Sequence, residues 1–231
     1  MIRLERFTHL TFDCYGTIID WESGILSAVR PVLESHGVSI AEDEILKLYA
    51  GHEAAQEAGP YKPYKQVLRG VMESLGSELG ISPSEADLRA LPESVGSWPP
   101  FPDSVEALQR LQVGFELVIL SNIDDDLFAQ TEALLGIDFD EVITAQQVGR
   151  YKPSTENFDF ALDRLQVPPQ QVLHVAQSLF HDHEPAKRLG FTTVWINRPS
   201  RCPGVGVAPP TQASPDVELP DLASLAELMS L

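Results

Sequence analysis

Five short apolar runs, spaced along the chain with helix-like segments among them, constrain the fold of this sequence most strongly. The runs are rich in Val, Ile and other β-branched residues, and they cover residues 8–12, 115–120, 141–145, 171–176 and 192–196. Short continuous apolar runs are typical of strands that are buried on both faces of a parallel sheet. The alternation of such strands with helices predicts an α/β fold with a Rossmann-like parallel sheet.

Residues 18–98 interrupt this alternation. Four helix-like segments, separated by Gly, Pro or Ser, follow one another there, at residues 22–37, 41–59, 64–80 and 83–96. An all-helical insertion after the first strand is expected above the carboxyl ends of the strands, where open α/β sheets bind ligands. We therefore predict a core of residues 1–17 and 99–231 and a helical cap of residues 18–98.

The charge of the chain excludes several classes of partner. Its net charge of −18 argues against nucleic acid, which needs clustered Lys and Arg, and it disfavours anionic membrane surfaces. No apolar run approaches the roughly 18 residues of a membrane span, and the first residues lack the pattern of a signal peptide. Two cysteines, Cys14 and Cys202, make no disulfide framework. We expect a cytoplasmic protein with a small-molecule substrate.

Polar clusters follow three of the apolar runs, and a fourth cluster follows the run at 141–145 by a few residues. They are Asp13, Tyr15 and Thr17; Ser121 and Asn122; Tyr151, Lys152 and Pro153; and Gln177 and Ser178 through Asp182. Because the carboxyl ends of parallel strands meet at one edge of a sheet, we expect these clusters to lie together.

The four clusters together resemble the haloacid dehalogenase superfamily, and specifically its L-2-haloacid dehalogenase-like branch. LTFDCYGTIIDW, VILSN, GRYKP and HVAQSLFHDHEPAKRLGF are similar to the four motifs of that superfamily, in the same order. The resemblance covers residues 8–198. It implies a Rossmann-like core with a helical cap, and hydrolysis of small 2-substituted carboxylic acids through an aspartyl ester.

The resemblance also implies roles for individual residues. Asp13 is expected to be the nucleophile, and Lys152 is expected to keep it ionised by lowering its pKa. Asp182 is expected to position or deprotonate the hydrolytic water, with Ser178 completing the hydrogen-bond network. The expected substrate-binding residues are Tyr15, Thr17, Ser121, Asn122, Gln177 and His52.

Two positions argue against a magnesium phosphatase. Phosphatases of the superfamily carry a second aspartate where this chain has Tyr15, and a phenol with a pKa of about 10 is a poor proton shuttle and a poor magnesium ligand. Gln177 likewise stands where an acid is typical. We therefore expect a reaction that needs no metal and no cofactor.

The leaving group is open at this stage. Dehalogenases of the branch carry a cap arginine that receives the halide, but residues 46–56 contain none. Either His52 or Arg69 replaces it, or the leaving group is not a halide. Relatives with similar motif wording open the ring of azetidine-2-carboxylate, where the amine stays attached. A magnesium phosphatase and a non-catalytic binding protein are further alternatives, and the resemblance also suggests a homodimer.

Overall fold

A computed structural model of the protein describes residues 4–199 and 213–229 and contains a six-stranded sheet. All five neighbouring pairs of strands are parallel, in the order β3-β2-β1-β4-β5-β6. The strands are β1 (His9–Phe12), β2 (Glu116–Ser121), β3 (Glu141–Thr144), β4 (Val172–Ala176), β5 (Thr192–Ile196) and β6 (Val217–Leu219). The predicted α/β fold is confirmed. Cys202 and most of the predicted loop at 198–215 lie outside the described residues.

The sheet is buried on both faces, which is why its strands read as continuous apolar runs. Leu10 of β1 is paired with Leu117 of β2 and Leu173 of β4, and all three belong to one hydrophobic cluster. Their neighbours in sequence, such as Val118 and Val172, point the other way into a second cluster.

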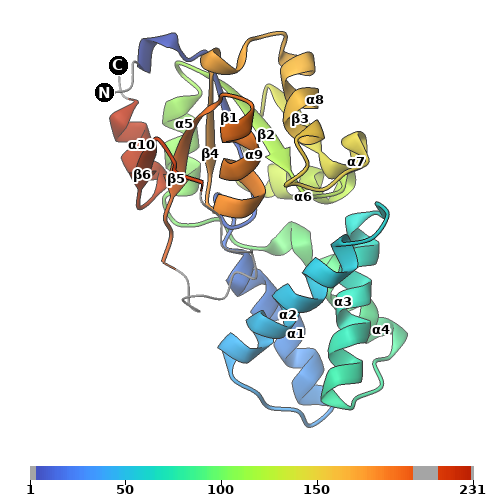
Figure 1. Ribbon diagram of the computed structural model, residues 1–231. Coiled ribbons are helices and arrows are strands. Elements are labelled where there is room, and N and C mark those ends of the chain that lie inside the picture. Colours follow the sequence, from blue (N-terminus) through green and yellow to red (C-terminus); the bar gives the residue numbers. More distant parts are fainter. Residues whose placement is uncertain (1–3, 200–212, 230–231) are drawn as a thin grey trace.

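Helices cover each face of the sheet (Figure 1). The first cluster includes side chains of α5 (Ser104–Leu111), α6 (Asp125–Leu135) and α10 (Leu222–Leu228). The second includes α8 (Glu156–Leu165) and α9 (Glu184–Arg188). Short turns of helix complete the core: η1 (Leu4–Arg6), α7 (Ala145–Val148), η3 (Pro169–Gln171) and η4 (Leu179–His183). Gly136 ends α6 with a φ of 64°, a left-handed conformation that glycine adopts easily.

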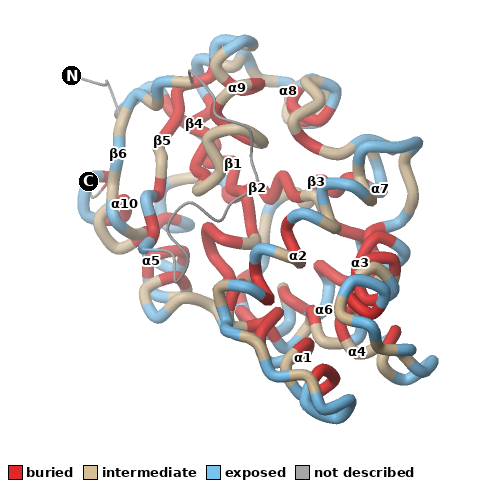
Figure 2. Tube along the Cα trace, turned by 60° about the horizontal axis from the view of Figure 1, so that its bottom comes forward, coloured by how far each residue is buried: buried red, intermediate tan, exposed pale blue. Residues whose placement is uncertain are grey.

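The four predicted helices of the insertion form a bundle at the carboxyl edge of the sheet (Figures 1 and 2). They are α1 (Trp21–Ser35), α2 (Glu42–Glu57), α3 (Tyr64–Leu79) and α4 (Glu85–Ser94), followed by η2 (Val95–Ser97). We call these helices the cap. The exact division of the chain at residues 17/18 and 98/99 stays a prediction. None of the helices in the described part of the chain has the length and apolar character to cross a membrane.

A buried aspartate ties the cap to the core. The Asp124 carboxylate, in the loop between β2 and α6, accepts hydrogen bonds from the backbone N–H groups of Tyr64 and Lys65, at 2.8 and 2.9 Å. These N–H groups open α3 and have no partner within that helix. Asp124 therefore acts as a cap for a helix 60 residues away in the sequence and fixes the start of α3 over the sheet edge.

Candidate active site

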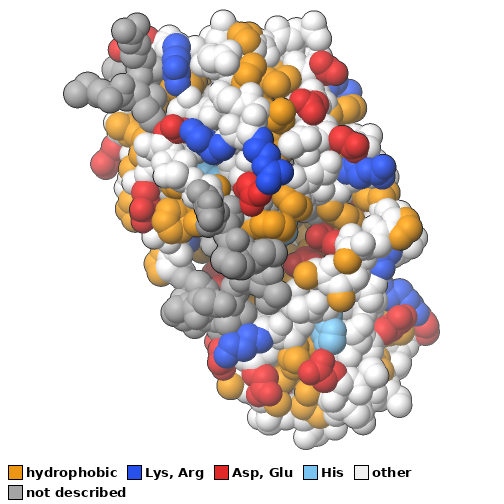
Figure 3. All heavy atoms as spheres, viewed as in Figure 1, with side chains coloured by type: hydrophobic (Ala, Val, Ile, Leu, Met, Phe, Trp, Pro, Cys, Tyr) orange, Lys and Arg blue, Asp and Glu red, His pale blue; other side chains and the backbone are white. Residues whose placement is uncertain are grey.

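A cavity of about 1230 Å³ lies between the carboxyl edge of the sheet and the cap. Its core wall is made by residues that follow β1, β2 and β4 and by the loop at 150–153, and its cap wall is made mainly by α2 and the segment that leads into α3. Figure 3 shows acidic and hydrophobic side chains gathered where the upper and lower parts of the molecule meet. The strand-end clusters therefore converge on one cavity, as the sequence predicts.

Asp13 stands directly after β1, at the floor of the cavity. Its N–H donates to the carbonyl of Val175, so that it continues the pairing of β1 with β4. The side chain is buried; its Oδ1 accepts from Lys152 Nζ at 2.9 Å and its Oδ2 accepts from Thr17 Oγ1 at 2.9 Å. Gly16, with a φ of 98°, makes the tight turn that brings Thr17 back beneath the carboxylate.

Lys152 joins two carboxylates in the buried centre of the site. Its ammonium donates to Asp13 Oδ1 at 2.9 Å, to Asp182 Oδ1 at 2.7 Å and to the carbonyl of Leu120 at 2.8 Å. An ammonium has three protons, so these three bonds use its full donor capacity. Asn122 fixes the lysine loop, because its amide accepts from the N–H of Lys152 at 2.7 Å and donates to the carbonyl of the same residue at 3.1 Å.

Asp182 is held from a second side by a histidine that the sequence analysis missed. His174, fully buried in β4, lies with its Nε2 3.1 Å from Asp182 Oδ1 and its Nδ1 2.9 Å from Thr11 Oγ1. Asp182 Oδ2 has no hydrogen-bond partner among the described residues. The signal in the sequence is a histidine inside an apolar strand, because a buried polar side chain requires a partner.

The three charged groups differ in their pKa shifts. Burial lowers the pKa of Lys152, but the two carboxylates raise it by more, so the group stays an ammonium. Burial raises the pKa of Asp182, but Lys152 and His174 lower it by more. For Asp13 the net direction is upward: burial and Asp182 outweigh Lys152. Lys152 by itself lowers the pKa of Asp13, as expected. The expected lowering of the pKa overall is wrong, because burial and Asp182 raise it by more.

Two predicted substrate-binding residues, Thr17 and Asn122, and the predicted catalytic residue Ser178 make contacts that support the catalytic groups. Thr17 is fully buried, does not line the cavity, and joins Asp13 to the backbone N–H of Gln177. Asn122 lines the cavity, but both ends of its amide are occupied by Lys152. Ser178 caps the turn of η4, where its Oγ accepts from the N–H of His181 at 3.1 Å.

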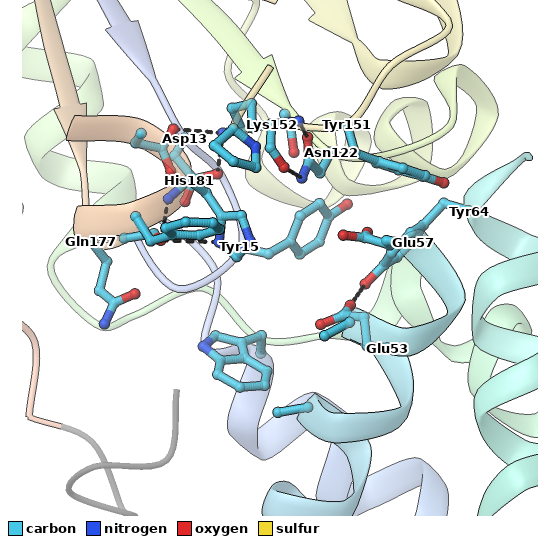
Figure 4. Close-up of a pocket in the computed structure, with 18 of the residues that line it drawn as sticks. Asp13, Tyr15, Glu53, Glu57, Tyr64, Asn122, Tyr151, Lys152, Gln177 and His181 are labelled. Carbon is cyan, nitrogen blue, oxygen red and sulfur yellow. Dashed lines mark hydrogen bonds and ion pairs between the residues drawn. The ribbon is translucent and has the colours of Figure 1, made fainter. Parts of the chain in front are cut away.

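Three other predicted residues line the cavity. Ser121 is only 3% exposed, and its hydroxyl has no hydrogen-bond partner among the described residues. Gln177 also lines the cavity and is labelled to the left of Tyr15 in Figure 4. The hydroxyl of Tyr15 lies 2.9 Å from Thr131 Oγ1, and burial raises the pKa of this phenol well above its usual value.

His52 and Arg69 do not lie where a halide receptor is needed. His52 is absent from the cavity wall, and its Nε2 lies 2.9 Å from Glu78 on the neighbouring helix. Arg69 is on the outer surface of α3, where it forms a bidentate ion pair with Glu85. The prediction of His52 as a substrate-binding residue is corrected, because the side chain of residue 52 on α2 turns toward α3 and away from the cavity.

The cap wall presents two acids that the sequence analysis did not single out, Glu53 and Glu57 (Figure 4). Glu53 Oε1 accepts hydrogen bonds from Tyr49, at 2.7 Å, and from Tyr64. Burial raises the pKa of both carboxyls, and the charge of Glu53 helps to raise that of Glu57 to about 9. Nothing in the sequence of α2 marked these two acids, since glutamates on a helix are most often solvated.

The residues of the site do not fit a magnesium ion. Mg²⁺ requires about six oxygen ligands in near-octahedral geometry. Of the oxygens of Asp13 and Asp182, only Asp182 Oδ2 lacks a partner among the described residues. The described residues also contain no group of three or more His, Cys, Asp or Glu arranged to hold a metal.

Comparisons with known proteins place the chain in a family. Residues 7–190 match the model of the haloacid dehalogenase-like hydrolase family. The chain is 25% identical over 227 residues to (S)-2-haloacid dehalogenase H-109 of Pseudomonas putida, covering 97% of this chain and 98% of that one. It is 29% identical over 242 positions to 5-amino-6-(5-phospho-D-ribitylamino)uracil phosphatase YigB of Escherichia coli, covering 98% of each. The structure of L-2-haloacid dehalogenase from Xanthobacter autotrophicus superposes with a TM-score of 0.80 at 25% identity, covering 96% of this chain and 98% of that one.

Proposed function

Since the chain belongs to the haloacid dehalogenase-like hydrolase family, we propose that it hydrolyses small 2-substituted carboxylic acids through an ester on Asp13, without a divalent cation. The observation that supports this most is the buried arrangement in which one ammonium, Lys152, joins Asp13 and Asp182 beside the cavity. The family match, together with the similarity to haloacid dehalogenases, identifies the chain as a haloacid dehalogenase-like hydrolase.

In the first step, a carboxylate oxygen of Asp13 attacks C2 of the substrate. A C–O bond forms, the bond between C2 and the leaving group breaks, and the leaving group departs with the electron pair. Lys152 and Thr17 hold the carboxylate in place, so that little reorientation is needed at the moment of attack. Ser121 offers an unpartnered hydroxyl to the substrate carboxylate.

In the second step, water attacks the carboxyl carbon of the Asp13 ester. The ester C–O bond breaks at that carbon, one proton of the water leaves with the 2-hydroxy acid, the other is released to solvent, and the carboxylate of Asp13 is restored. Asp182 Oδ2, which has no partner among the described residues, positions the water. Its low pKa suits a group that accepts a hydrogen bond from water rather than one that keeps a proton.

A second candidate reaction is the opening of azetidine-2-carboxylate by the same two steps. The observation that favours it is the cap wall, where the described residues that line the cavity include Glu53 and Glu57 and no arginine; Arg150 lines the cavity from the loop of the core. A halide that leaves toward the cap wall meets no counter-charge there. A ring amine keeps its attachment to the substrate and needs no such receptor.

The test is a panel of L-2-chloropropionate, L-azetidine-2-carboxylate and p-nitrophenyl phosphate, each with EDTA or with Mg²⁺. We expect turnover of a carboxylic acid that EDTA does not change. Turnover of the phosphate ester alone, abolished by EDTA, would show a phosphatase instead.

Two variants report on the intermediate. Asp13→Asn should remove all activity, whereas Asp182→Asn should slow only hydrolysis, so that mass spectrometry detects a substrate adduct on Asp13. A complete lack of turnover and adduct on every substrate of the panel would favour a non-catalytic binding protein.

A further inference from the structure

The charges that line the cavity are unbalanced in favour of acids. Four carboxyl groups line it, and they belong to Asp13, Glu53, Glu57 and Asp182. The cations of the lining are Lys152 and Arg150. The three protons of Lys152 are already bound on the core wall, and Arg150 is exposed and forms an ion pair with Glu156 at 3.1 Å. The cap wall therefore has no lining cation of its own in the described part of the chain.

The two acids of the cap wall lie one helical turn apart on α2 but are paired differently. Glu53 accepts from two phenols, Tyr49 and Tyr64, whose hydroxyl oxygens lie 2.9 Å from each other. Two such bonds stabilise the ionised form of Glu53. Glu57 has no hydrogen bond or ion pair recorded within the described residues, and its side chain is turned into the cavity, facing Tyr15 and Tyr151 (Figure 4). The wall thus offers one fixed carboxylate and one carboxyl that is free to bind.

A second polar group without a partner belongs to a residue that lines the same cavity on its core wall. Ser121, 3% exposed, presents a hydroxyl that no described residue binds, next to the buried Lys152. A buried hydroxyl without a partner is costly, and a ligand that bonds to it repays that cost. The cavity therefore has a donor for an anion at one wall and acceptors for a cation at the other.

We propose that Glu53 and Glu57 bind a protonated amine of the substrate, so that the cavity selects small amino acids that carry a carboxylate and an ammonium together. This assignment shares one assumption with the proposed function, namely that the substrate binds in this cavity. An amine leaves easily only when its nitrogen is already protonated, because the electron pair of the breaking C–N bond then yields a neutral amine. Carboxyls at this wall would keep that nitrogen in its cationic form.

Proton linkage provides an independent sign of such a site. Burial and Glu53 raise the pKa of Glu57 to about 9, so the free protein carries a proton there at neutral pH. A bound ammonium favours the carboxylate, and the proton is released. The other titratable or charged groups around Glu57 lie on several elements. They are Tyr15 after β1, Tyr49 and Glu53 on α2, Tyr61 before α3, Tyr64 at the start of α3, and Arg150, Tyr151 and Lys152 in the loop at 150–153.

The experiment compares two ligands that differ only in the amine. L-azetidine-2-carboxylate and cyclobutanecarboxylate have the same ring size, and titration calorimetry measures their binding to the Asp13→Asn protein, in which turnover is blocked. We expect the amine to bind at least about tenfold more tightly at pH 7, as for a hydrogen bond to a charged group. We also expect it to release a proton to the buffer, which two buffers of different ionisation enthalpy reveal.

Adding Glu57→Gln to the Asp13→Asn protein should reduce the preference for the amine over cyclobutanecarboxylate to less than about threefold and abolish the proton release. The control is Glu44→Gln, which changes an exposed acid of the same helix and should alter neither quantity. Equal affinity for the two ligands, no measurable binding of the amine, or an unchanged preference in Glu57→Gln would overturn the proposal. If Glu57→Gln does not fold, the preference of the Asp13→Asn protein must rise between pH 6 and 9, and a flat profile would contradict the proposal.

The two proposals fail in different ways. Turnover of L-2-chloropropionate without any preference for an amine would keep the ester mechanism and overturn the ammonium site. An amine preference that depends on Glu57, with no ester ever formed on Asp13, would keep the ammonium site and overturn the mechanism.

Discussion

The core wall and the cap wall of the cavity differ in how completely their charged groups are paired. On the core wall, Lys152 donates all three protons, and both oxygens of Asp13 accept a hydrogen bond. On the cap wall, Glu57 faces the cavity with no bond recorded in the described residues. A network whose charged groups are mostly paired is held in one geometry. The difference supports our proposal that the core wall carries the chemistry and that the cap wall selects the leaving group.

The largest effect is expected when the pairing of the core wall is broken. Lys152→Met leaves two buried carboxylates without their counter-ion, and removing one partner of a buried ion pair costs about 3–5 kcal/mol. Urea unfolding should show this loss, and activity should fall at least about a thousandfold, because a protonated Asp13 cannot attack.

Lys47→Met is the matched control. Lys47 pairs with Asp43 on the surface of α2, where an exposed ion pair contributes little to stability. A Lys152→Met protein as stable and as active as this control would mean that the core wall does not depend on its central ammonium.

A smaller effect, a gain in stability instead of a loss, is expected when Glu57 on the cap wall is replaced. The pKa of Glu57 rises from 4.5 to about 9 in the folded protein, so the native state binds a proton that the unfolded chain has lost between these values. Stability therefore falls as the pH rises through this range. Glu57→Gln removes the effect and should be more stable than the parent at pH 8.5 by at least about 1 kcal/mol, with a much smaller difference at pH 5.

Denaturant unfolding at several pH values measures this difference, with Glu44→Gln as the exposed control. Parallel pH profiles for the parent and Glu57→Gln would show that Glu57 is ionised in the folded protein, and the contrast between the two walls would be lost.

The smallest effect is expected at Tyr15, which lines the cavity but is tied to the core. Its hydroxyl lies 2.9 Å from Thr131, and burial keeps its pKa well above the usual value, so it is a poor proton shuttle. Tyr15→Phe should lose about 1 kcal/mol of stability and change kcat by less than about threefold. A hundredfold fall in kcat at unchanged stability would mean that the phenol acts on the substrate.

The fold was predictable because burial on both faces of the sheet leaves a direct mark on the sequence. The runs at 8–12 and 192–196 became β1 and β5 within one residue of their predicted bounds. Asp13 and Lys152 were predictable for a related reason, because residues that follow parallel strands meet at one edge. Their contact of 2.9 Å agrees with the pairing of these two residues that the family resemblance implied.

The rest of the site depended on packing that no local pattern records. His174 belongs to an apolar strand, and only the three-dimensional structure shows that its partner is Asp182. On α2, His52 and Glu53 are neighbours in the sequence, yet only Glu53 lines the cavity, because the docking of α2 against α3 decides which side faces the core. Asn122 was expected to bind substrate but holds the backbone of Lys152 instead.

The central claim, that Asp13 forms an ester which water then hydrolyses at its carboxyl carbon, is tested most directly by a single turnover in ¹⁸O water. The enzyme is used in excess over whichever substrate of the panel it turns over. The account predicts that the 2-hydroxy acid takes its oxygen from Asp13 and contains no label, while mass spectrometry finds one ¹⁸O in the peptide that carries Asp13. Labelled product with an unlabelled Asp13 would contradict it, because water would then have attacked the substrate directly.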